Sequence, residues 1–345
     1  MSKKVKFGII GFGNIGTRYK KRIDENPSAE LVAIAEIKRK KLESIKNKSI
    51  KKYKNYKKLI QNPDVDVVIV AVPNYLHKQL SIEALDASKH VVCEKPMAIK
   101  TLDANQMILA SQKTNKKLFV VKQNRFNPPV KKVKELIENN KLGKIGLVVV
   151  NCYWNRNNEY YKKSDWRGRK KEDGGTIFTQ FSHFVDIVYF LMGDFINVSA
   201  EGFNFNHKKL IEFEDTGVVR FKMANGALGS LNYTTCSYAQ NMEGSITLFG
   251  EKGTVKIGGQ YLNTLDYYKI EKVRKINLEK GNTANDYGSY KGSMSNHGKI
   301  IKNVIGTLQG NGFVATSAFE GMKIVQVIEA MYESMKSNGK TIKIH

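Results

Sequence analysis

The sequence predicts an α/β protein with a doubly wound parallel sheet at the N-terminus and a second α/β domain with a large, mostly antiparallel sheet behind it. Over residues 1–121, apolar runs of strand length alternate with helix-length segments, which is the pattern of a parallel sheet. A glycine-rich turn directly follows the first run. After residue 121 come segments in which apolar and polar residues alternate, as in strands with one buried face. We therefore expect two domains, 1–121 and 122–345, and 345 residues suffice for both.

Strands and helices are expected to alternate through the first domain. Residues 64–72 form a nearly continuous apolar run, of the kind that a parallel sheet buries on both faces. Thr101 is expected to cap a helix that carries Asp103 in its first turn. The expected strands are Val5–Ile10, 31–37, 64–72, His90–Cys93 and 118–121, and the expected helices are 15–25, 38–58, 76–88 and Thr101–Thr114.

The second domain is expected to consist mainly of strands. A helix over 128–139 ends near Gly143, and a helix over 179–191 interrupts the strands. Residues 280–296 are rich in Gly, Ser, Asn and Tyr and are expected to form a loop. The clearest strand patterns are Thr216–Met223, 227–235 and 245–257, and two last helices are expected at 296–308 and 317–337.

The turn after the first strand has the spacing of a phosphate-binding loop, Gly11-x-Gly13-x-x-Gly16. It follows an apolar strand and opens a helix, which is the context that dinucleotide binding requires. Gly11 permits the tight turn, Gly13 lets the backbone approach a pyrophosphate, and Gly16 lets helix and strand pack closely. The helix N-terminus offers free N–H groups to the phosphates. The expected cofactor contacts in this loop are Gly11, Phe12, Gly13, Asn14 and Ile15.

An acidic residue, Glu36, ends the second expected strand, twenty residues after Gly16. A carboxylate at this place binds the adenosine ribose hydroxyls and repels a 2′-phosphate. The sequence therefore favours NAD over NADP as the cofactor, although Lys38 and Arg39 lie close by.

The formal net charge is +25, which raises the question of a nucleic-acid partner. The densest run, 38–58, holds eleven Lys or Arg against one Glu, but apolar residues recur in it at helical spacing. A solvated amphipathic helix is the simpler interpretation, so we expect no nucleic acid. A positive field that attracts anionic substrates, such as a diphosphate, is the functional alternative.

Composition also bears on redox compartment, metals and membranes. Cys93, Cys152 and Cys236 lie far apart, as is typical of free thiols in a reducing cytoplasm. The six histidines show no zinc-binding spacing, so no metal is expected. The sequence has no apolar run near the ~18 residues of a membrane helix, and glycines interrupt the apolar stretch at the N-terminus. We expect a cytoplasmic chain without membrane contact.

Further motifs resemble one family over nearly the whole chain. They are Pro73-Asn74-Tyr-Leu-His77, Glu94-Lys95-Pro96, and Gly174-Gly175 followed by His183-Phe-Val-Asp186. Together with the phosphate loop they resemble the Gfo/Idh/MocA oxidoreductases. The resemblance implies an NAD-binding Rossmann domain, a C-terminal domain whose open sheet mediates homodimers or homotetramers, and hydride transfer between a sugar or cyclitol carbon and nicotinamide.

A narrower resemblance points to the nucleotide-sugar members. It rests on 123–129, on Asp165-Trp166-Arg167-Gly168 and on Ser295-Asn296-His297. Such members oxidise C3 of UDP-N-acetylglucosamine or its uronate to a 3-keto sugar for surface polysaccharide or lipid A synthesis. One departure is Thr179, where many relatives carry Asp or Asn one helical turn before the motif histidine. A hydroxyl cannot serve as a carboxylate base, so more of the chemistry falls on Lys95 and His183.

Lys95 and His183 are the expected catalytic residues. Lys95 follows a sheet strand at its carboxyl end, where open α/β sheets bind ligands. We expect it to hydrogen-bond the reacting hydroxyl or to relay its proton. His183 is the expected general base in oxidation and acid in the reverse direction, because an imidazole pKa near ~6.5 suits both. A satisfied core histidine is the alternative.

The remaining candidates have cofactor or substrate roles. Pro73, Asn74 and His77 are expected near nicotinamide, or His77 caps the next helix, and Glu94 is expected to contact the nicotinamide ribose. Asn124, Arg125, Trp166 and Arg167 are candidates for binding a sugar or diphosphate, with structural roles as the alternative. Lys95, Thr179 and His183 complete the expected substrate contacts. The competing hypotheses are a dehydrogenase of a free sugar or inositol, and a non-catalytic NAD-binding regulator.

Overall fold

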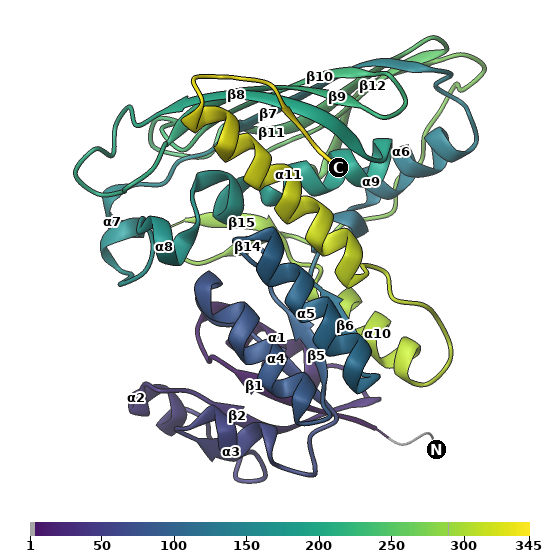
Figure 1. Cartoon of the computed structure of the whole chain (residues 1–345). Coiled ribbons are helices and arrows are strands. Elements are labelled where there is room, and N and C mark those ends of the chain that lie inside the picture. The colour runs from purple at the N-terminus through teal and green to yellow at the C-terminus, as the bar shows by residue number, and fades with distance from the viewer. Residues whose placement is uncertain (1–3, 289) are drawn as a thin grey trace. The chain divides into compact units, whose positions relative to one another are not determined.

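The computed structural model describes residues 4–288 and 290–345, and the chain divides into two compact units. The first comprises 1–121 with 297–325, and the second 122–296 with 326–345. Figure 1 shows the elements of both units, most of them labelled. The chain first changes unit at the expected position, but 297–325 was expected in the second domain and belongs to the first. The physical reason is that α10 (His297–Leu308) buries an apolar stripe against α1 (Asn14–Asp24).

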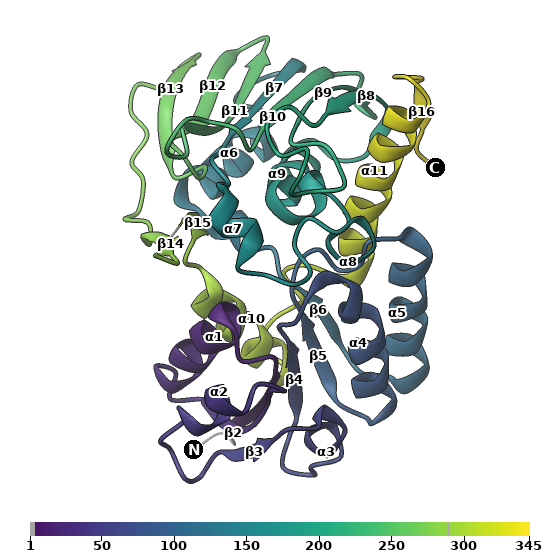
Figure 2. The same ribbon diagram turned by 90° about the vertical axis from the view of Figure 1, so that its left-hand side faces the viewer.

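The first unit is a Rossmann fold, which confirms the expected fold class. Its six strands are all parallel, in the order β3-β2-β1-β4-β5-β6. Figure 2 shows α1 and α10 on one side of the sheet and α4 and α5 on the other. With helices on both faces, the four residues of β4 (Val67–Val70) are completely buried. The other elements are β1 (Val5–Ile10), β2 (Ala29–Ala35), β5 (His90–Cys93), β6 (Leu118–Val120), η1 (Asn74–Leu76), α4 (His77–Asp86) and α5 (Thr101–Thr114).

The basic segment 38–58 is not the single helix that its spacing predicted. It contains α2 (Arg39–Glu43), the edge strand β3 (Lys51–Tyr53) and the start of α3 (Tyr56–Ile60). Local hydrogen bonds shape the connections between these elements. The Asn47 side chain accepts from the Ser49 N–H (3.0 Å) in the turn before β3, and Asn55 caps α3 by accepting from the Lys57 N–H (2.9 Å).

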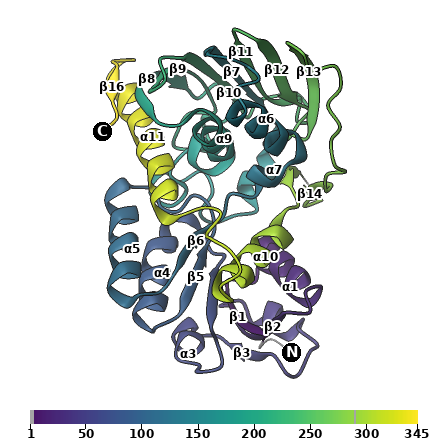
Figure 3. The same cartoon turned by 90° about the vertical axis from the view of Figure 1, so that its right-hand side faces the viewer.

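The second unit contains an eight-stranded sheet in the order β13-β12-β11-β7-β10-β9-β8-β16. All neighbours are antiparallel except β7 and β10. Alternate residues of β7, Val148, Val150 and Cys152, are completely buried. Figure 3 shows α6 and α9 against one face of the sheet. The strands are β7 (Ile145–Tyr153), β8 (Phe195–Phe203), β9 (Thr216–Met223), β10 (Leu228–Thr234), β11 (Glu243–Gly250), β12 (Gly253–Gly258), β13 (Thr264–Ile270) and β16 (Ile342–Lys343).

Two other predicted segments of this unit differ from expectation. The run 245–257 is a hairpin of β11 and β12 rather than one strand, because Gly250 and Gly253 flank a tight turn. The expected loop 280–296 contains a small hairpin of β14 (Ala284–Asp286) and β15 (Lys291–Met294). The helices are η2 (Gln123–Phe126), α6 (Pro128–Glu138), α7 (Asn158–Lys162), α8 (Lys170–Asp173), the π-helical η3 (Ile177–Phe181), α9 (Ser182–Met192) and α11 (Ala318–Lys336), which begins in the first unit.

Within the described residues, no helix has the length and apolar character needed to cross a bilayer.

Candidate active site

The turn between β1 and α1 has glycines where side chains do not fit. Gly11 has a φ of +91°, and a Cβ there would lie 2.3 Å from the carbonyl oxygen of Ala71. A Cβ on Gly16 would lie 2.1 Å from the carbonyl oxygen of Gly11. Gly13 precedes the first turn of α1, and among the described residues no side chain caps that turn. Its N–H groups and partial positive charge therefore form a candidate phosphate site.

Glu36 folds back onto this loop from the end of β2. Its Oε2 accepts a hydrogen bond from the Phe12 N–H (2.8 Å), and its Oε1 accepts from the Lys38 N–H (2.9 Å). The residue is 8% exposed, and Lys41 Nζ lies 3.9 Å from Oε2. The expected ribose-binding carboxylate is thus held against the candidate phosphate site by backbone donors.

Lys95 lies two residues beyond β5, at the carboxyl end of a central strand of the parallel sheet. Its peptide bond to Pro96 is cis. The ring of His77 braces this segment, with Nδ1 2.7 Å from the carbonyl oxygen of Pro96 and Nε2 3.0 Å from that of Val72. Burial lowers the pKa of His77. Its side chain makes no capping bond to α4 among the described residues, so His77 acts on the backbone around Lys95.

Glu94 precedes Lys95 and is buried in a small polar network. Its carboxylate accepts hydrogen bonds from the Tyr19 hydroxyl (2.8 Å) and the Lys95 N–H (3.2 Å), and His297 Nε2 lies 3.5 Å from it. Burial alone would raise the pKa of Glu94, but His297, Tyr19 and Lys95 outweigh it and lower that pKa. Tyr19 was not among the predicted site residues; it lies on the buried stripe of α1.

In the second unit, two glycines lead into the helix that carries His183. Gly174 and Gly175 have φ angles of +92° and +129°, and a Cβ on Gly175 would lie 2.1 Å from the Tyr332 hydroxyl oxygen. That hydroxyl accepts a hydrogen bond from the Ile177 N–H (3.0 Å) and donates one to Glu214 (2.7 Å). Burial raises the pKa of Glu214 to about 7. The glycine pair thus lets Tyr332 hold the start of the helix.

Thr179 and His183 lie one turn apart where π-helical η3 joins α9. His183 is 3% exposed. The Thr179 hydroxyl contacts the carboxylate of Asp173, which also accepts a hydrogen bond from the Gly168 N–H (2.8 Å). The carboxylate of Asp173 therefore lies next to the side chain of Thr179, which has no carboxylate of its own. Asp173 was not among the predicted site residues, because its contact with Thr179 depends on the turn at Gly174.

Arg125 was expected to bind substrate or to have a structural role, and it lies in a buried ion pair. Its Nε and Nη2 donate to the two carboxylate oxygens of Asp186 (3.0 and 2.8 Å). Lys122 Nζ lies 3.7 Å from the same carboxylate, and the guanidinium lies 4.8 Å from the centre of the Phe190 ring. This geometry favours the structural alternative for Arg125.

Asn124, the neighbour of Arg125, has a different environment. It is 1% exposed, and neither its amide nitrogen nor its amide oxygen has a hydrogen-bond partner among the described residues. Buried amides without partners are rare, so Asn124 remains a candidate for binding a polar ligand.

Arg167 lies among aromatic rings. Its guanidinium carbon is 4.3 Å from the centre of the Tyr160 ring, 5.6 Å from that of Trp166 and 5.8 Å from that of Tyr290. Arg156, which the sequence analysis missed, contacts the rings of Tyr160 and Tyr290 at 5.3 and 5.2 Å. Within the part of the chain that the structure describes, neither arginine has an ion pair with a carboxylate. The buried Arg156 guanidinium already donates to Gln180 Oε1, the Asn155 carbonyl oxygen and Asn241 Oδ1 (2.7, 2.6 and 3.2 Å), so Arg167 is the candidate for an anionic ligand.

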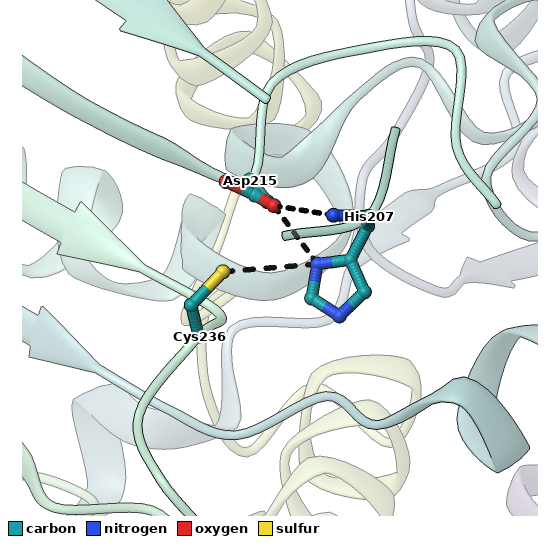
Figure 4. Close-up of side chains that lie close together, drawn as sticks. All are labelled: His207, Asp215 and Cys236. Atoms are coloured by element: carbon teal, nitrogen blue, oxygen red, sulfur yellow. Dashed lines mark hydrogen bonds and ion pairs between the residues drawn. The ribbon is translucent and has the colours of Figure 1, made fainter. Parts of the chain in front are cut away.

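His207, Asp215 and Cys236 converge in the second unit, with potential metal-ligand atoms within 4.8 Å of one another (Figure 4). His207 Nδ1 lies 2.9 Å from Asp215 Oδ2 and 3.7 Å from Cys236 Sγ. Burial alone would lower the pKa of His207, but Asp215 and Cys236 raise it to about 9. The His207 ring and the Asp215 carboxylate thus form a close pair beside the Cys236 thiol.

Two family models together match most of the chain. The model of the Gfo/Idh/MocA oxidoreductase family with an NAD-binding Rossmann fold matches residues 5–122, and the model of that family's C-terminal α/β domain matches 134–344.

Solved structures and curated proteins are also similar. The WlbA dehydrogenase from Bordetella pertussis, in complex with NADH and UDP-GlcNAcA, is 34% identical, with a TM-score of 0.89 and 99% of each chain covered. The corresponding enzyme from Chromobacterium violaceum, in the same kind of complex, is 32% identical, with a TM-score of 0.90, covering 100% of this chain and 97% of that chain. Myo-inositol 2-dehydrogenase from Thermotoga maritima is 30% identical over 264 residues, 73% of this chain and 74% of that protein.

Proposed function

Because this chain belongs to the Gfo/Idh/MocA family and is an NAD-dependent sugar dehydrogenase, we propose that it oxidises C3 of a UDP-N-acetylhexosamine or its uronate to a 3-keto sugar. The product would serve surface polysaccharide or lipid A synthesis. The observation that carries the proposal is the likeness, over nearly the whole chain, to two dehydrogenases crystallised with NADH and UDP-GlcNAcA. Arg167 supports it, because it has no ion pair with a carboxylate among the described residues and a nucleotide sugar brings an anion.

The residues fit an NAD site. The phosphate loop, with Phe12, Asn14 and Ile15 around its glycines, would hold the pyrophosphate, and Glu36 would hold the adenosine ribose. Glu94, Pro73 and Asn74 lie beyond the neighbouring central strands and would hold the nicotinamide end. When bound, NAD supplies the acceptor for the hydride that leaves the sugar carbon.

Two side chains are proposed for the proton that leaves the sugar hydroxyl. Lys95 would hydrogen-bond that hydroxyl, with its backbone fixed by Glu94 and by His77 through Pro96. His183 would take the proton, because an imidazole can exchange it near neutral pH. Thr179 and Asn124 would orient the sugar through hydrogen bonds. Trp166 and Arg167 would contact the diphosphate that is attached to the sugar.

The proposal is tested by incubating the purified protein with NAD and a panel of sugars. The panel contains UDP-N-acetylglucosamine, its uronate, glucose, glucose 6-phosphate and myo-inositol, each with and without 2-oxoglutarate as a second substrate to which the protein would pass the hydride of NADH, giving 2-hydroxyglutarate. A product two mass units lighter, formed from a UDP-sugar alone, is the expected result. Turnover of inositol or a free sugar instead would exclude the nucleotide-sugar assignment and favour the alternative supported by the Thermotoga maritima relative.

A matched pair of variants separates catalysis by Lys95 from a general effect of charge. Lys95→Met is expected to lower kcat at least a hundredfold while NADH still binds, because removing one hydrogen-bond donor to an oxygen that gains negative charge in the reaction typically costs about 10²–10³ in kcat. Lys100→Met removes an exposed lysine five residues further on and should leave kcat within twofold. Equal activity of the two variants would exclude a catalytic role for Lys95.

We also propose a homodimer or homotetramer that uses the outer face of the eight-stranded sheet. Large apolar side chains on that face are exposed, among them Leu147, Leu228 and Phe249. Exposed apolar patches of this kind mark protein interfaces.

A further inference from the structure

We propose that a cationic pocket in the second unit binds the diphosphate of the nucleotide-sugar substrate. The pocket has a volume of about 380 Å³ and lies where the segment after α7 meets the loop after β8. We call it the lysine pocket. This inference rests on the proposed function and names the part of the protein that recognises the nucleotide. The cationic residues that line it are Lys162, Arg167, Arg169, Lys208 and Lys209.

Positive charge in this pocket is poorly compensated. Glu212 is the one carboxylate among its described lining residues, and that carboxylate already accepts a hydrogen bond from the Lys170 N–H (2.9 Å). Arg169 reaches Glu172 at 3.9 Å, whereas Lys162, Lys208 and Lys209 form no ion pair within residues 4–288 and 290–345. Like charges gathered around a hollow repel one another, and a bound dianion would relieve this repulsion.

The loop that carries two of these lysines is held in place. The Asp215 carboxylate accepts hydrogen bonds from the N–H groups of Phe205, Asn206 and His207 (2.8, 2.7 and 3.1 Å), and the His207 ring lies against it (Figure 4). Lys208 and Lys209 follow His207 directly. Their backbone is thus fixed before any ligand arrives, which lowers the entropic cost of binding.

Arg167 supplies the inner cation of the lysine pocket. The rings of Tyr160, Trp166 and Tyr290 lie around its guanidinium, and its Nη1 and Nη2 make only long hydrogen bonds, to the Tyr160 carbonyl oxygen and the Tyr290 hydroxyl (3.5 Å each). A guanidinium fixed by aromatic rings presents a planar fork of donors, which suits phosphate oxygens.

Hydrogen bonds join the lysine pocket to the helix with the expected catalytic histidine, inside one unit. Gly168 lines the pocket and donates to Asp173, which contacts Thr179. Tyr160, against which Arg167 packs, accepts a hydrogen bond from Gln180 (2.7 Å). These bonds connect the residues that would bind the diphosphate to η3, the segment that leads into α9 and His183. Such a connection is expected if the diphosphate and the sugar of one substrate bind at the two ends of this network.

The test measures binding of UDP to the full-length protein by isothermal titration calorimetry. Lys208→Glu/Lys209→Glu reverses two exposed charges of the pocket and is expected to raise the Kd for UDP at least tenfold. The matched control Lys131→Glu/Lys141→Glu makes the same change of charge at exposed residues outside the pocket and should leave the Kd within twofold. NADH titrations of both variants verify that they are folded.

Further titrations and assays separate this inference from the proposed function. Inorganic diphosphate should compete with UDP, and uridine should not. An unchanged Kd in the pocket variant, or competition by uridine alone, would overturn the inference. If the variant keeps its kcat/KM for a UDP-sugar, the pocket inference fails while the proposed function stands. If UDP binds through the pocket but no UDP-sugar is oxidised, the proposed function fails while the anion site stands.

Discussion

At the scale of single residues, Glu36 is expected to determine which dinucleotide is used. Its carboxylate is buried against the phosphate loop by the Phe12 and Lys38 N–H groups, so its charge is fixed in position. Glu36→Ser should raise the KM for NAD about 10–100-fold, since a hydrogen bond to a charged group contributes about 1.5–3 kcal/mol. The same variant should use NADP better relative to NAD, because the repulsion of the 2′-phosphate is removed.

Steady-state kinetics with both cofactors check this prediction. Glu30→Ser serves as the control, because Glu30 is an exposed carboxylate on the same strand, β2. An unchanged NAD-to-NADP preference in Glu36→Ser would show that the ribose is recognised elsewhere.

The ion pair of Arg125 and Asp186 gives a second residue-scale prediction. Removing one partner of a buried ion pair leaves an uncompensated charge, which costs about 3–5 kcal/mol. Arg125→Leu and Asp186→Leu should each lower the free energy of unfolding by this amount in urea titrations, and the double variant should lose less than the sum. Full stability of Arg125→Leu together with weakened UDP binding would instead make Arg125 a substrate ligand.

Residues in local motifs could be predicted from the sequence, whereas residues with distant partners could not. The roles of Gly11 and Gly16 follow from a turn between adjacent elements. Arg125 and Asp186 are 61 positions apart, and the Arg156 environment depends on Tyr290 from another segment. Nothing in the local sequence distinguishes an arginine that binds substrate from one that pairs with a buried aspartate.

At the scale of elements, Glu214 ties the start of η3 to α11 and should make stability depend on pH. Burial raises its pKa from 4.5 to about 7, so between these values the folded protein binds more protons than the unfolded chain. Stability from this group is therefore lost as pH rises through 7. The excess stability of wild type over Glu214→Gln should fall by about 3 kcal/mol from pH 4.5 to pH 8.

Urea unfolding of wild type and Glu214→Gln across this range measures the effect. His207 titrates near 9 in the folded state and is present in both proteins, so it cancels in the difference. Glu201→Gln, at an exposed carboxylate on β8, should show no such dependence. A difference that stays constant with pH would mean that Glu214 is already ionised at pH 4.5.

Elements themselves were predictable where periodicity persisted over many residues. The four-residue core of β4 lies inside the predicted strand 64–72, since burial on both faces demands apolar residues throughout. The prediction of one helix over 38–58 was wrong, because short elements contain too few residues to distinguish helical from strand spacing. The turn bond of Asn47 and the capping bond of Asn55 lie between the elements of this segment, and such bonds depend on a backbone already folded.

At the scale of the whole molecule, the eight-stranded sheet offers the proposed interface between copies. Leu147 lies directly opposite both Leu228 and Phe249 on neighbouring strands, so the three side chains share one face. They are 41%, 59% and 43% exposed, while the alternate residues of β7 on the opposite face are buried. This contrast between the two faces is stronger than scattered surface apolar residues would produce.

We expect Leu147→Lys/Leu228→Lys to yield single chains of 39.0 kDa where wild type gives a dimer or tetramer. Two lysines on opposed strands would place like charges in the desolvated centre of the interface, which is costly. Light scattering coupled to size exclusion measures the masses. The control Leu102→Lys/Leu109→Lys alters leucines of α5 that are 66% and 62% exposed, and its mass should match wild type. A monomeric wild type, or an intact oligomer in the sheet variant, would exclude this face as the interface.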